Sequence, residues 1–212
     1  MGISLNKLLS IAGSRLCPKS PRLAPELIEL AGNQGNQLVE LLDHKNGFYA
    51  FENAFHVFPS GCSDLYIDLE TWNHPNSWRK YYWELVKDSL FFAEDVFGVQ
   101  FCIRGGKIQK FDPEAGEFED MAENLEEWAT KILEDPEYEI GYKLVQAWQQ
   151  QNGSLLSGSR LLPKTPFIFG GEYEINNLYM LDSLKAMEFR ADIWRQIRDL
   201  PDGTGIKLKI VQ

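Results

Sequence analysis

The chain has 212 residues, of which 21 are Lys or Arg and 31 are Asp or Glu, so its formal net charge is −10. A content of 44% hydrophobic and 13% aromatic residues is that of a globular protein and excludes a disordered or collagen-like chain. The acidic balance excludes a broad nucleic-acid-binding surface, because such surfaces are rich in Lys and Arg. We therefore expect one folded domain whose partners are not nucleic acids.

The cysteines and the N-terminus bear on the compartment. Cys17, Cys62 and Cys102 form no C-x-x-C pair and no zinc pattern. The first 13 residues lack the continuous apolar stretch of a signal peptide, and no stretch reaches the roughly 20 apolar residues that span a membrane. We predict three reduced thiols in a cytoplasmic protein with no membrane association, no metal and no cofactor.

The N-terminal third is predicted to be an arm followed by the start of the domain. Residues 1–24 form the arm, with a short helix over 4–12 before Pro18 and Pro21 interrupt any regular pattern. The domain spans residues 25–212. Its first helices are predicted from Pro25, interrupted by glycines, then over 37–43, and then over 78–88 with Ser77 as the N-cap.

The middle of the chain shows strand signals. Residues 90–92 and 99–104 are apolar and aromatic, and the second run alternates between apolar and polar positions. Gly105-Gly106 suits a two-residue hairpin turn, and residues 112–116 supply a second turn with Pro and Gly. These signals predict three antiparallel strands in a meander between residues 90 and 121.

Helical signals dominate the last part of the chain. Asn124 and Glu127 resemble a capping box before an apolar stripe that runs to Leu133. A further helix is predicted from Pro136 to about residue 152, another after Ser183, and a final strand over 206–211. The predicted fold class is α+β, an antiparallel sheet meander flanked by helices.

Negative charge is concentrated in residues 112–139, which contain twelve carboxylates and the single base Lys131. A surface of this kind steers a cationic protein partner, whereas the alternative is a set of solvated outward faces that favour helix N-termini. Trp72 lies beside Asn73-His74-Pro75-Asn76, where an exposed loop Trp anchors a partner or, alternatively, covers the core. The predicted partner-binding residues are Asp112, Glu114, Glu117, Glu119, Asp120, Glu123, Glu126, Glu127 and Trp72.

The search for catalytic groups yields one weak candidate. Glu94 and Asp95 lie just after a predicted apolar strand and before Gly98. Adjacent residues of extended chain point to opposite faces, whereas acid–base chemistry needs two carboxyls across one substrate, so we expect one of them to bind turn amides. His44, His56 and His74 fit no metal pattern, and we expect packed or surface rings, with His56 buried and one nitrogen satisfied. Nucleotide-binding glycine loops and a nucleophile elbow are absent from the sequence.

The order of several segments resembles the SUKH superfamily, which includes yeast cell-wall-synthesis regulators and bacterial immunity proteins. The resemblance runs from about residue 37 to 135 and lies in residues 46–51, 90–98, 100–103, 111–117 and 125–128. It implies an α+β domain that binds proteins, often toxins, without catalysis. Val99 follows Gly98 where many members carry a polar residue, and no functional residues transfer from the family.

The resemblance and the acidic segment together lead to a functional hypothesis. We expect a non-enzymatic immunity protein that occludes a basic toxin through the carboxylates of residues 112–139. One alternative is a cytosolic scaffold or regulator of the same superfamily. The other is a small-substrate enzyme that uses Glu94 or Asp95.

Overall fold

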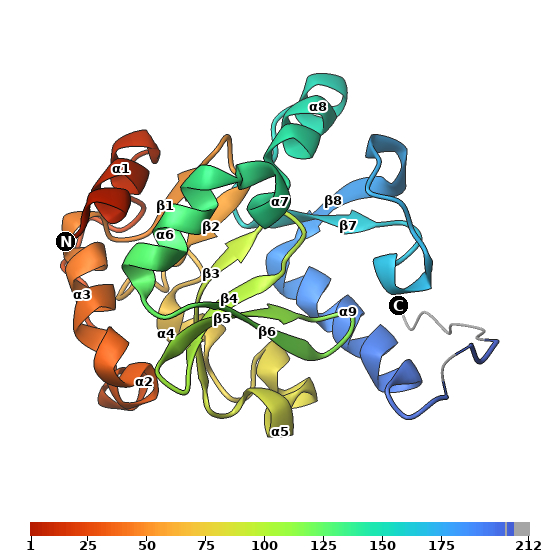
Figure 1. Ribbon diagram of the computed structural model, residues 1–212, viewed down its shortest axis with the longest axis horizontal. Helices are drawn as coiled ribbons and strands as arrows, with labels where there is room; N and C mark the ends of the chain where they lie inside the picture. Colours follow the sequence, from red (N-terminus) through yellow and green to blue (C-terminus); the bar gives the residue numbers. More distant parts are fainter. Residues whose placement is uncertain (202, 206–212) are drawn as a thin grey trace.

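The computed structural model describes residues 1–201 and 203–205 and contains a six-stranded antiparallel sheet with the order β1-β2-β3-β4-β5-β6 (Figure 1). Helices surround this meander, and a two-stranded sheet lies near the C-terminal helix, so the α+β prediction is confirmed. The strands are β1 Phe48–Ala50, β2 Phe55–Val57, β3 Ser89–Asp95, β4 Gln100–Arg104, β5 Lys107–Asp112, β6 Glu117–Ala122, β7 Ser159–Pro163 and β8 Leu178–Asp182.

Strands β3 to β6 follow the predicted turns. Gly105 and Gly106 have φ values of 58° and 82°, which suits the tight β4–β5 turn. The β5–β6 turn runs from Asp112 to Gly116, whose amide donates to the Asp112 carbonyl. The meander therefore forms with four strands where three were predicted, and β1 and β2 extend it on the β3 side.

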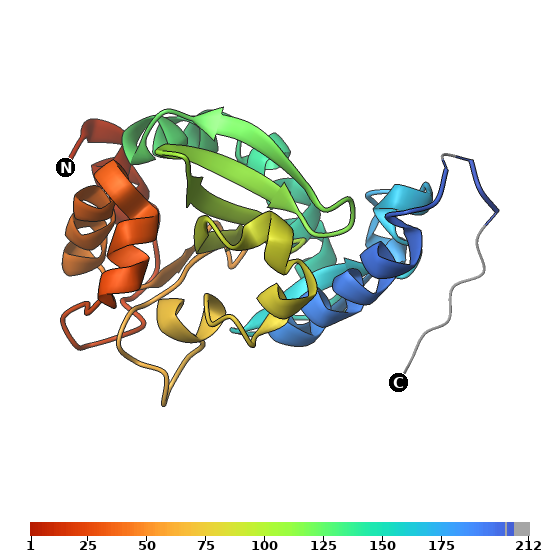
Figure 2. The same ribbon diagram turned by 90° about the horizontal axis from the view of Figure 1, so that it is seen from below.

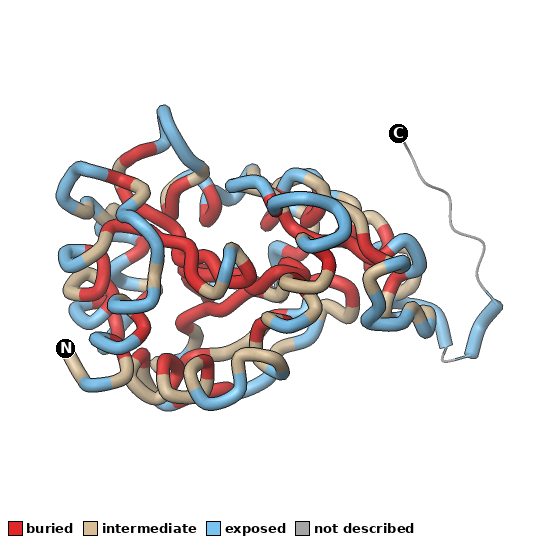
Figure 3. The backbone as a smooth tube through the Cα atoms, turned by 90° about the horizontal axis from the view of Figure 1, so that it is seen from above, coloured by how far each residue is buried: buried red, intermediate tan, exposed pale blue. Residues whose placement is uncertain are grey.

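Aromatic side chains on the two faces of the sheet pack against helical segments on both sides. Phe92 and Phe101 pack against Trp128 of α6, whereas Phe91 and Phe111 pack against Trp78. The core is therefore continuous through the sheet, and buried residues concentrate in strands β1 to β4, along the middle of the molecule (Figure 3).

The helices differ in two places from the sequence prediction. Residues 78–88 form a 3₁₀ turn and a short helix, and the Ser77 side chain does not cap them. The helix predicted from Pro136 divides at Gly141, whose φ is 66° and whose added Cβ would lie 2.4 Å from the Phe97 ring. The α-helices are α1 Ile3–Ile11, α2 Pro25–Ala31, α3 Gly35–His44, α4 Leu69–Trp72, α5 Trp83–Val86, α6 Leu125–Glu134, α7 Pro136–Ile140, α8 Tyr142–Asn152 and α9 Ser183–Ile197; the 3₁₀ helices are η1 Gly32–Gln34, η2 Trp78–Tyr81, η3 Phe167–Phe169 and η4 Ile175–Asn177.

The N-terminal residues belong to the domain and do not form a separate arm. Leu5 and Leu8 of α1 are buried in the common core, and α1 lies beside α6 (Figure 1). Residues 13–17 then follow the outer edge of β1, where the amide of Gly13 donates to the Tyr49 carbonyl. The arm prediction is therefore corrected: burial of α1 and pairing with β1 hold residues 1–17 against the sheet.

Cys17 and Cys62 form a disulfide, so the prediction of three reduced thiols is wrong. The bond joins the N-terminal segment to the loop that follows β2, which are 45 residues apart in sequence. Cys102 is a free thiol buried in β4, as predicted for that residue.

Removal of this bond by Cys17→Ser/Cys62→Ser is expected to lower the free energy of unfolding by about 3 kcal/mol, because the open chain gains loop entropy when it unfolds. Urea unfolding monitored by tryptophan fluorescence measures the loss. The control is the wild-type protein in a reductant, which should lose the same amount. Three reactive thiols in the denatured, unreduced protein would contradict the bond.

The C-terminal part of the described chain forms a separate small sheet that lies against the end of β3. The amide of Leu161 in β7 donates to the carbonyl of Val96, which directly follows β3, so the small β7–β8 sheet is joined to the large one. Helix α9 lies at this end of the molecule, opposite α1 to α3 (Figure 2). The predicted strand over 206–211 lies outside the described residues. Within the described part of the chain, no helix has the length and apolarity needed to cross a membrane.

Candidate acidic groove

The predicted partner-binding carboxylates do not form one surface. Glu114 is buried and pairs with Arg190 of α9, and Glu126 accepts hydrogen bonds from the amides of Ser4 and Leu5 at the start of α1. These two groups therefore stabilise the protein's own helices and are not available to a partner.

Three more of the predicted carboxylates are engaged by lysines at the surface. Asp120 and Glu123 lie 3.8 Å and 2.7 Å from the Lys107 ammonium, and Glu127 lies 3.7 Å from that of Lys131. Glu127 also accepts from the Glu123 amide, next to the Asn124 cap of α6. Local ion pairs thus reduce the negative field of this part of the segment.

The remaining predicted carboxylates line a groove of about 770 Å³. This acidic groove lies between the β5–β6 end of the sheet and helix α7, and it carries six carboxyl groups and two lysines. Its lining residues are Asp95, Phe97, Val99, Lys110, Asp112, Glu117, Phe118, Glu119, Glu137, Tyr138, Glu139, Gly141, Lys143, Leu144 and Tyr173.

Strand register places charges face to face at one wall of the acidic groove. Lys110 lies opposite Glu119, whereas Asp112 lies directly opposite Glu117. Like charges opposite one another destabilise an antiparallel pair. Within the described chain, no cation forms an ion pair with Glu117 or Glu119, and both side chains are exposed. This wall therefore presents negative charge that the fold does not neutralise.

Helix α7 forms the facing wall. Asp135 caps the helix by accepting from the Tyr138 amide, and Glu139 forms an ion pair with Lys110 across the groove. The Tyr138 and Tyr173 side chains remain 73% and 60% exposed at the rim. Exposed rings beside carboxylates suit a ligand with cationic groups on a carbon chain, because the rings attract cations and cover the chain.

Asp95 is the last residue of β3 and lies at the inner end of the acidic groove. Its carboxylate accepts from the Val99 amide at 2.8 Å, and only 5% of the residue is exposed. Burial raises the pKa of Asp95 to about 7, although this hydrogen bond and the neighbouring Arg190 and Lys110 favour the ionised form. The groove therefore contains one carboxyl that titrates near neutral pH.

Glu94 and Asp95 point to opposite sides of β3, as predicted, and line different cavities. Burial alone would raise the pKa of Glu94, but Arg160 and a hydrogen bond with His56 outweigh it and lower that pKa. The two carboxyls therefore do not form an acid–base pair across one substrate.

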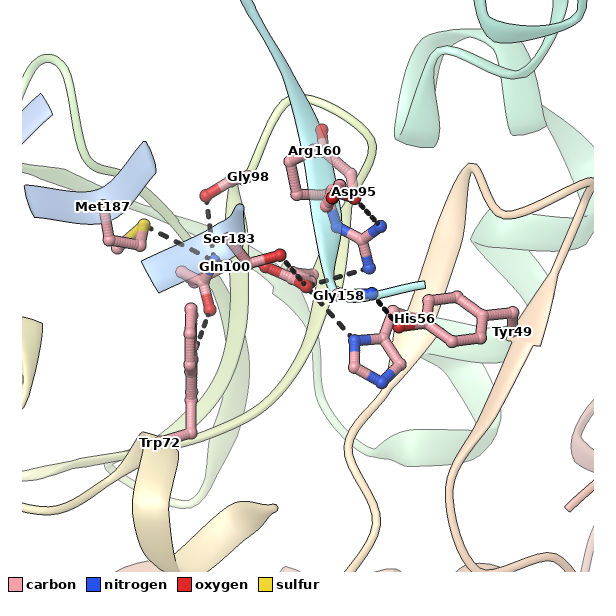
Figure 4. A network of polar contacts seen from close by, with 12 residues as sticks. Tyr49, His56, Trp72, Asp95, Gly98, Gln100, Gly158, Arg160, Ser183 and Met187 are labelled. Atoms are coloured by element: carbon pink, nitrogen blue, oxygen red, sulfur yellow. Dashed lines mark hydrogen bonds and ion pairs between the residues drawn. The ribbon is translucent and has the colours of Figure 1, made fainter. Parts of the chain in front are cut away.

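Trp72 is a core residue and not a surface anchor. The side chain is 1% exposed in α4, stacks on Phe58, and donates its indole N–H to Gln100 Oε1 at 2.8 Å (Figure 4). The prediction of a binding role is corrected, because the one-turn helix Leu69–Trp72 turns the ring inward onto the sheet.

The histidines behave as predicted. His56 is buried and uses Nδ1 toward Glu94 at 3.1 Å, whereas His44 and His74 are exposed. Among the described residues, no group of three or more His, Cys, Asp or Glu side chains is arranged to hold a metal ion.

Sequence reasoning missed the aromatic rim of the acidic groove, and it named Asp95 as a catalytic candidate without placing it in the groove. Tyr173 lies 78 positions after Asp95 and reaches the groove only through the chain path between β7 and β8. The one available signal was the density of acidic residues on both sides of Asn124. That density identified the acidic segment but did not show which of its side chains line the groove.

In fold, the protein is similar to a protein of Agrobacterium tumefaciens whose structure is titled "Crystal structure of Atu4351 from Agrobacterium tumefaciens". The TM-score is 0.57 and the sequence identity is 16%, over 86% of each chain. At this identity the likeness shows the fold alone. No family model and no curated protein matches the sequence.

Proposed function

We propose that the protein is a non-enzymatic binding module that holds a cationic segment of a partner protein in the acidic groove. The observation that carries the proposal is the pair of exposed carboxylates Glu117 and Glu119 on the groove wall, with which no cation of the described chain forms an ion pair. Glu137 of α7 adds a further carboxylate to the same groove.

The same proposal includes the immunity role expected from the sequence. A basic toxin would present the Lys- or Arg-rich segment, and an acidic occluding surface would speed association through long-range attraction. A scaffold or regulator of the SUKH type would use the same groove for a host protein. Pull-down with the products of neighbouring genes separates these roles, because a toxin partner supports immunity and a host enzyme supports regulation.

Neutralisation of the groove wall tests the binding site. Glu117→Gln/Glu119→Gln is expected to weaken binding of a short fluorescent peptide of alternating Lys and Ser about tenfold at low salt, because two unneutralised charges are lost. Fluorescence anisotropy measures the dissociation constant, and the difference should shrink as salt is added.

The matched control is Glu134→Gln/Glu188→Gln, which removes the same charge from exposed positions outside the acidic groove. Equal weakening by the two double variants would show attraction to net charge only and would overturn the groove as the site. Failure of the wild-type protein to bind the peptide would overturn the proposal as a whole.

The immunity proposal places the protein in the cytoplasm. The Cys17–Cys62 disulfide argues against this location. Cytoplasmic thiols are normally kept reduced. Alkylation of thiols in intact cells before lysis decides the compartment. Alkylated Cys17 and Cys62 support the cytoplasm, and an intact bond places the protein in an oxidising compartment.

A further inference from the structure

A second cavity lies on the side of β3 opposite the acidic groove. It has a volume of about 330 Å³, and three aromatic residues other than histidine contribute to its walls. Its lining residues are Tyr49, His56, Phe58, Leu65, Tyr66, Ile67, Glu94, Ser157, Gly158, Asp182 and Ser183. We call it the His56 cavity.

A buried polar cluster fixes the orientation of the His56 ring. Glu94 Oε1 lies 3.1 Å from His56 Nδ1, 2.8 Å from Arg160 Nη2 and 3.3 Å from Ser183 Oγ (Figure 4). An ionised carboxylate only accepts hydrogen bonds, so Nδ1 must carry the proton that it shares with Glu94. Nε2 is then the unprotonated nitrogen of the ring.

Nε2 of His56 is an acceptor without a partner. It is buried and has no hydrogen-bond partner among the described residues. A buried acceptor that stays unpaired costs about 1–3 kcal/mol, so the native protein gains from any molecule that donates to it. His56 is 4% exposed and lines the cavity. A molecule bound in the cavity can therefore supply the missing hydrogen bond to Nε2.

Aromatic rings pack against the His56 ring and line the same cavity. The Tyr49 ring stacks on His56 at 4.2 Å with an angle of 15° between the planes, and Phe58 meets it edge-on at 4.6 Å. Tyr49 is itself held by the Gly158 amide, which donates to its hydroxyl. The third ring, Tyr66, comes from the loop after Cys62, where Leu65 is 65% exposed. Flat walls and a buried, unpaired acceptor favour a planar molecule over a chain-like one.

The His56 ring is suited to binding and poorly suited to proton abstraction. Burial lowers the pKa of His56 to about 4, and Arg160 contributes in the same direction against the opposing effect of Glu94. A base this weak gives little driving force for proton transfer near neutral pH. As a neutral acceptor it nevertheless discriminates between ligands that have a donor and ligands that lack one.

We propose that the His56 cavity binds a small planar aromatic molecule that carries one N–H or O–H donor, held by donation to His56 Nε2. The rings of Tyr49, Phe58 and Tyr66 supply the apolar contact. This site is independent of the acidic groove and does not rest on the binding function proposed for it.

The probe is indole, compared with 1-methylindole, which has the same ring and no N–H. Titration of the ¹⁵N-labelled protein is followed through the side-chain resonance of His56, identified as the histidine that stays neutral below pH 6. Indole is expected to shift Nε2 and to bind about tenfold more tightly than 1-methylindole, the difference that one hydrogen bond provides. Equal affinities, or no binding of indole, would overturn the proposal.

A variant at the mouth of the cavity locates the site without disturbing the core. Ser157 is exposed and lines the cavity, so Ser157→Trp should fill the entrance and abolish indole binding. Ser154→Trp places the same side chain at an exposed position of the same loop outside the cavity and should leave the affinity unchanged. Binding that survives Ser157→Trp would place indole elsewhere and overturn the assignment.

Discussion

Glu94→Ala is expected to lower the free energy of unfolding by about 3–5 kcal/mol, because it leaves the Arg160 guanidinium buried without its ion-pair partner. Arg160 is fully buried, and its Nη2 lies 2.8 Å from the Glu94 carboxylate. His56 and Ser183 lose their acceptor in the same variant. Urea unfolding at pH 7, followed by circular dichroism, measures the loss.

Two controls separate this effect from the loss of a carboxylate in general. Glu84→Ala removes a side chain that is 82% exposed and should cost less than about 0.5 kcal/mol. Glu94→Gln/Arg160→Met removes both charges and should be more stable than Glu94→Ala, since no isolated charge stays buried. A Glu94→Ala loss as small as that of Glu84→Ala would contradict the buried pair.

Asp95→Asn is expected to stabilise the protein at pH 8 by as much as about 4 kcal/mol and to have little effect near pH 4. The pKa of Asp95 is about 7 in the folded protein, whereas its ordinary value, which we take for the unfolded chain, is 3.8. Each pKa unit of difference corresponds to about 1.4 kcal/mol of folding free energy. Between these values the unfolded chain releases a proton that the folded chain retains. Stability therefore falls as pH rises from about 4 to 7, and the variant lacks this fall.

The comparison must use the difference between variant and wild type at each pH. His56 acts in the opposite direction, because its pKa is lowered from 6.5 to about 4, so its contribution to stability is lost as pH falls through that window. The two effects partly cancel in the wild-type curve. Glu117→Gln, an exposed change in the same groove, is the control. A constant difference between Asp95→Asn and wild type from pH 4 to 8 would contradict the raised pKa.

The fold was predictable where periodicity and turn chemistry agreed. A meander of three strands was anticipated between residues 90 and 121, because β4 alternates and Gly105-Gly106 marks its turn, and the structure has four strands there, β3 to β6. Strands β1 and β2 were missed because each has three residues and all are buried, so no alternation exists to detect. The Cys17–Cys62 pairing joins distant segments, and no local pattern reports such a contact.

The candidate site was predictable only in part, because local sequence reports the density of charge and not its direction. Glu114 turns inward because Arg190 reaches it from α9, 76 positions later. Asp112, Glu117 and Glu119 line the acidic groove because the β5–β6 register places them around Lys110. Trp72 was placed in a loop because the turn residues that follow it obscure a helix of one turn.

The sheet is open, and its two outer strands end in different ways. Residues 13–17 already bond to β1, so that border offers little free backbone. Beyond β6 the described sheet has no further strand, and Glu117 and Glu119 on β6 are exposed to solvent. A second copy that approaches the β6 edge is repelled by these carboxylates before its backbone can pair with β6. Edge-to-edge aggregation into fibres is therefore disfavoured. The carboxylates that we assign to recognition thus also keep neighbouring copies apart.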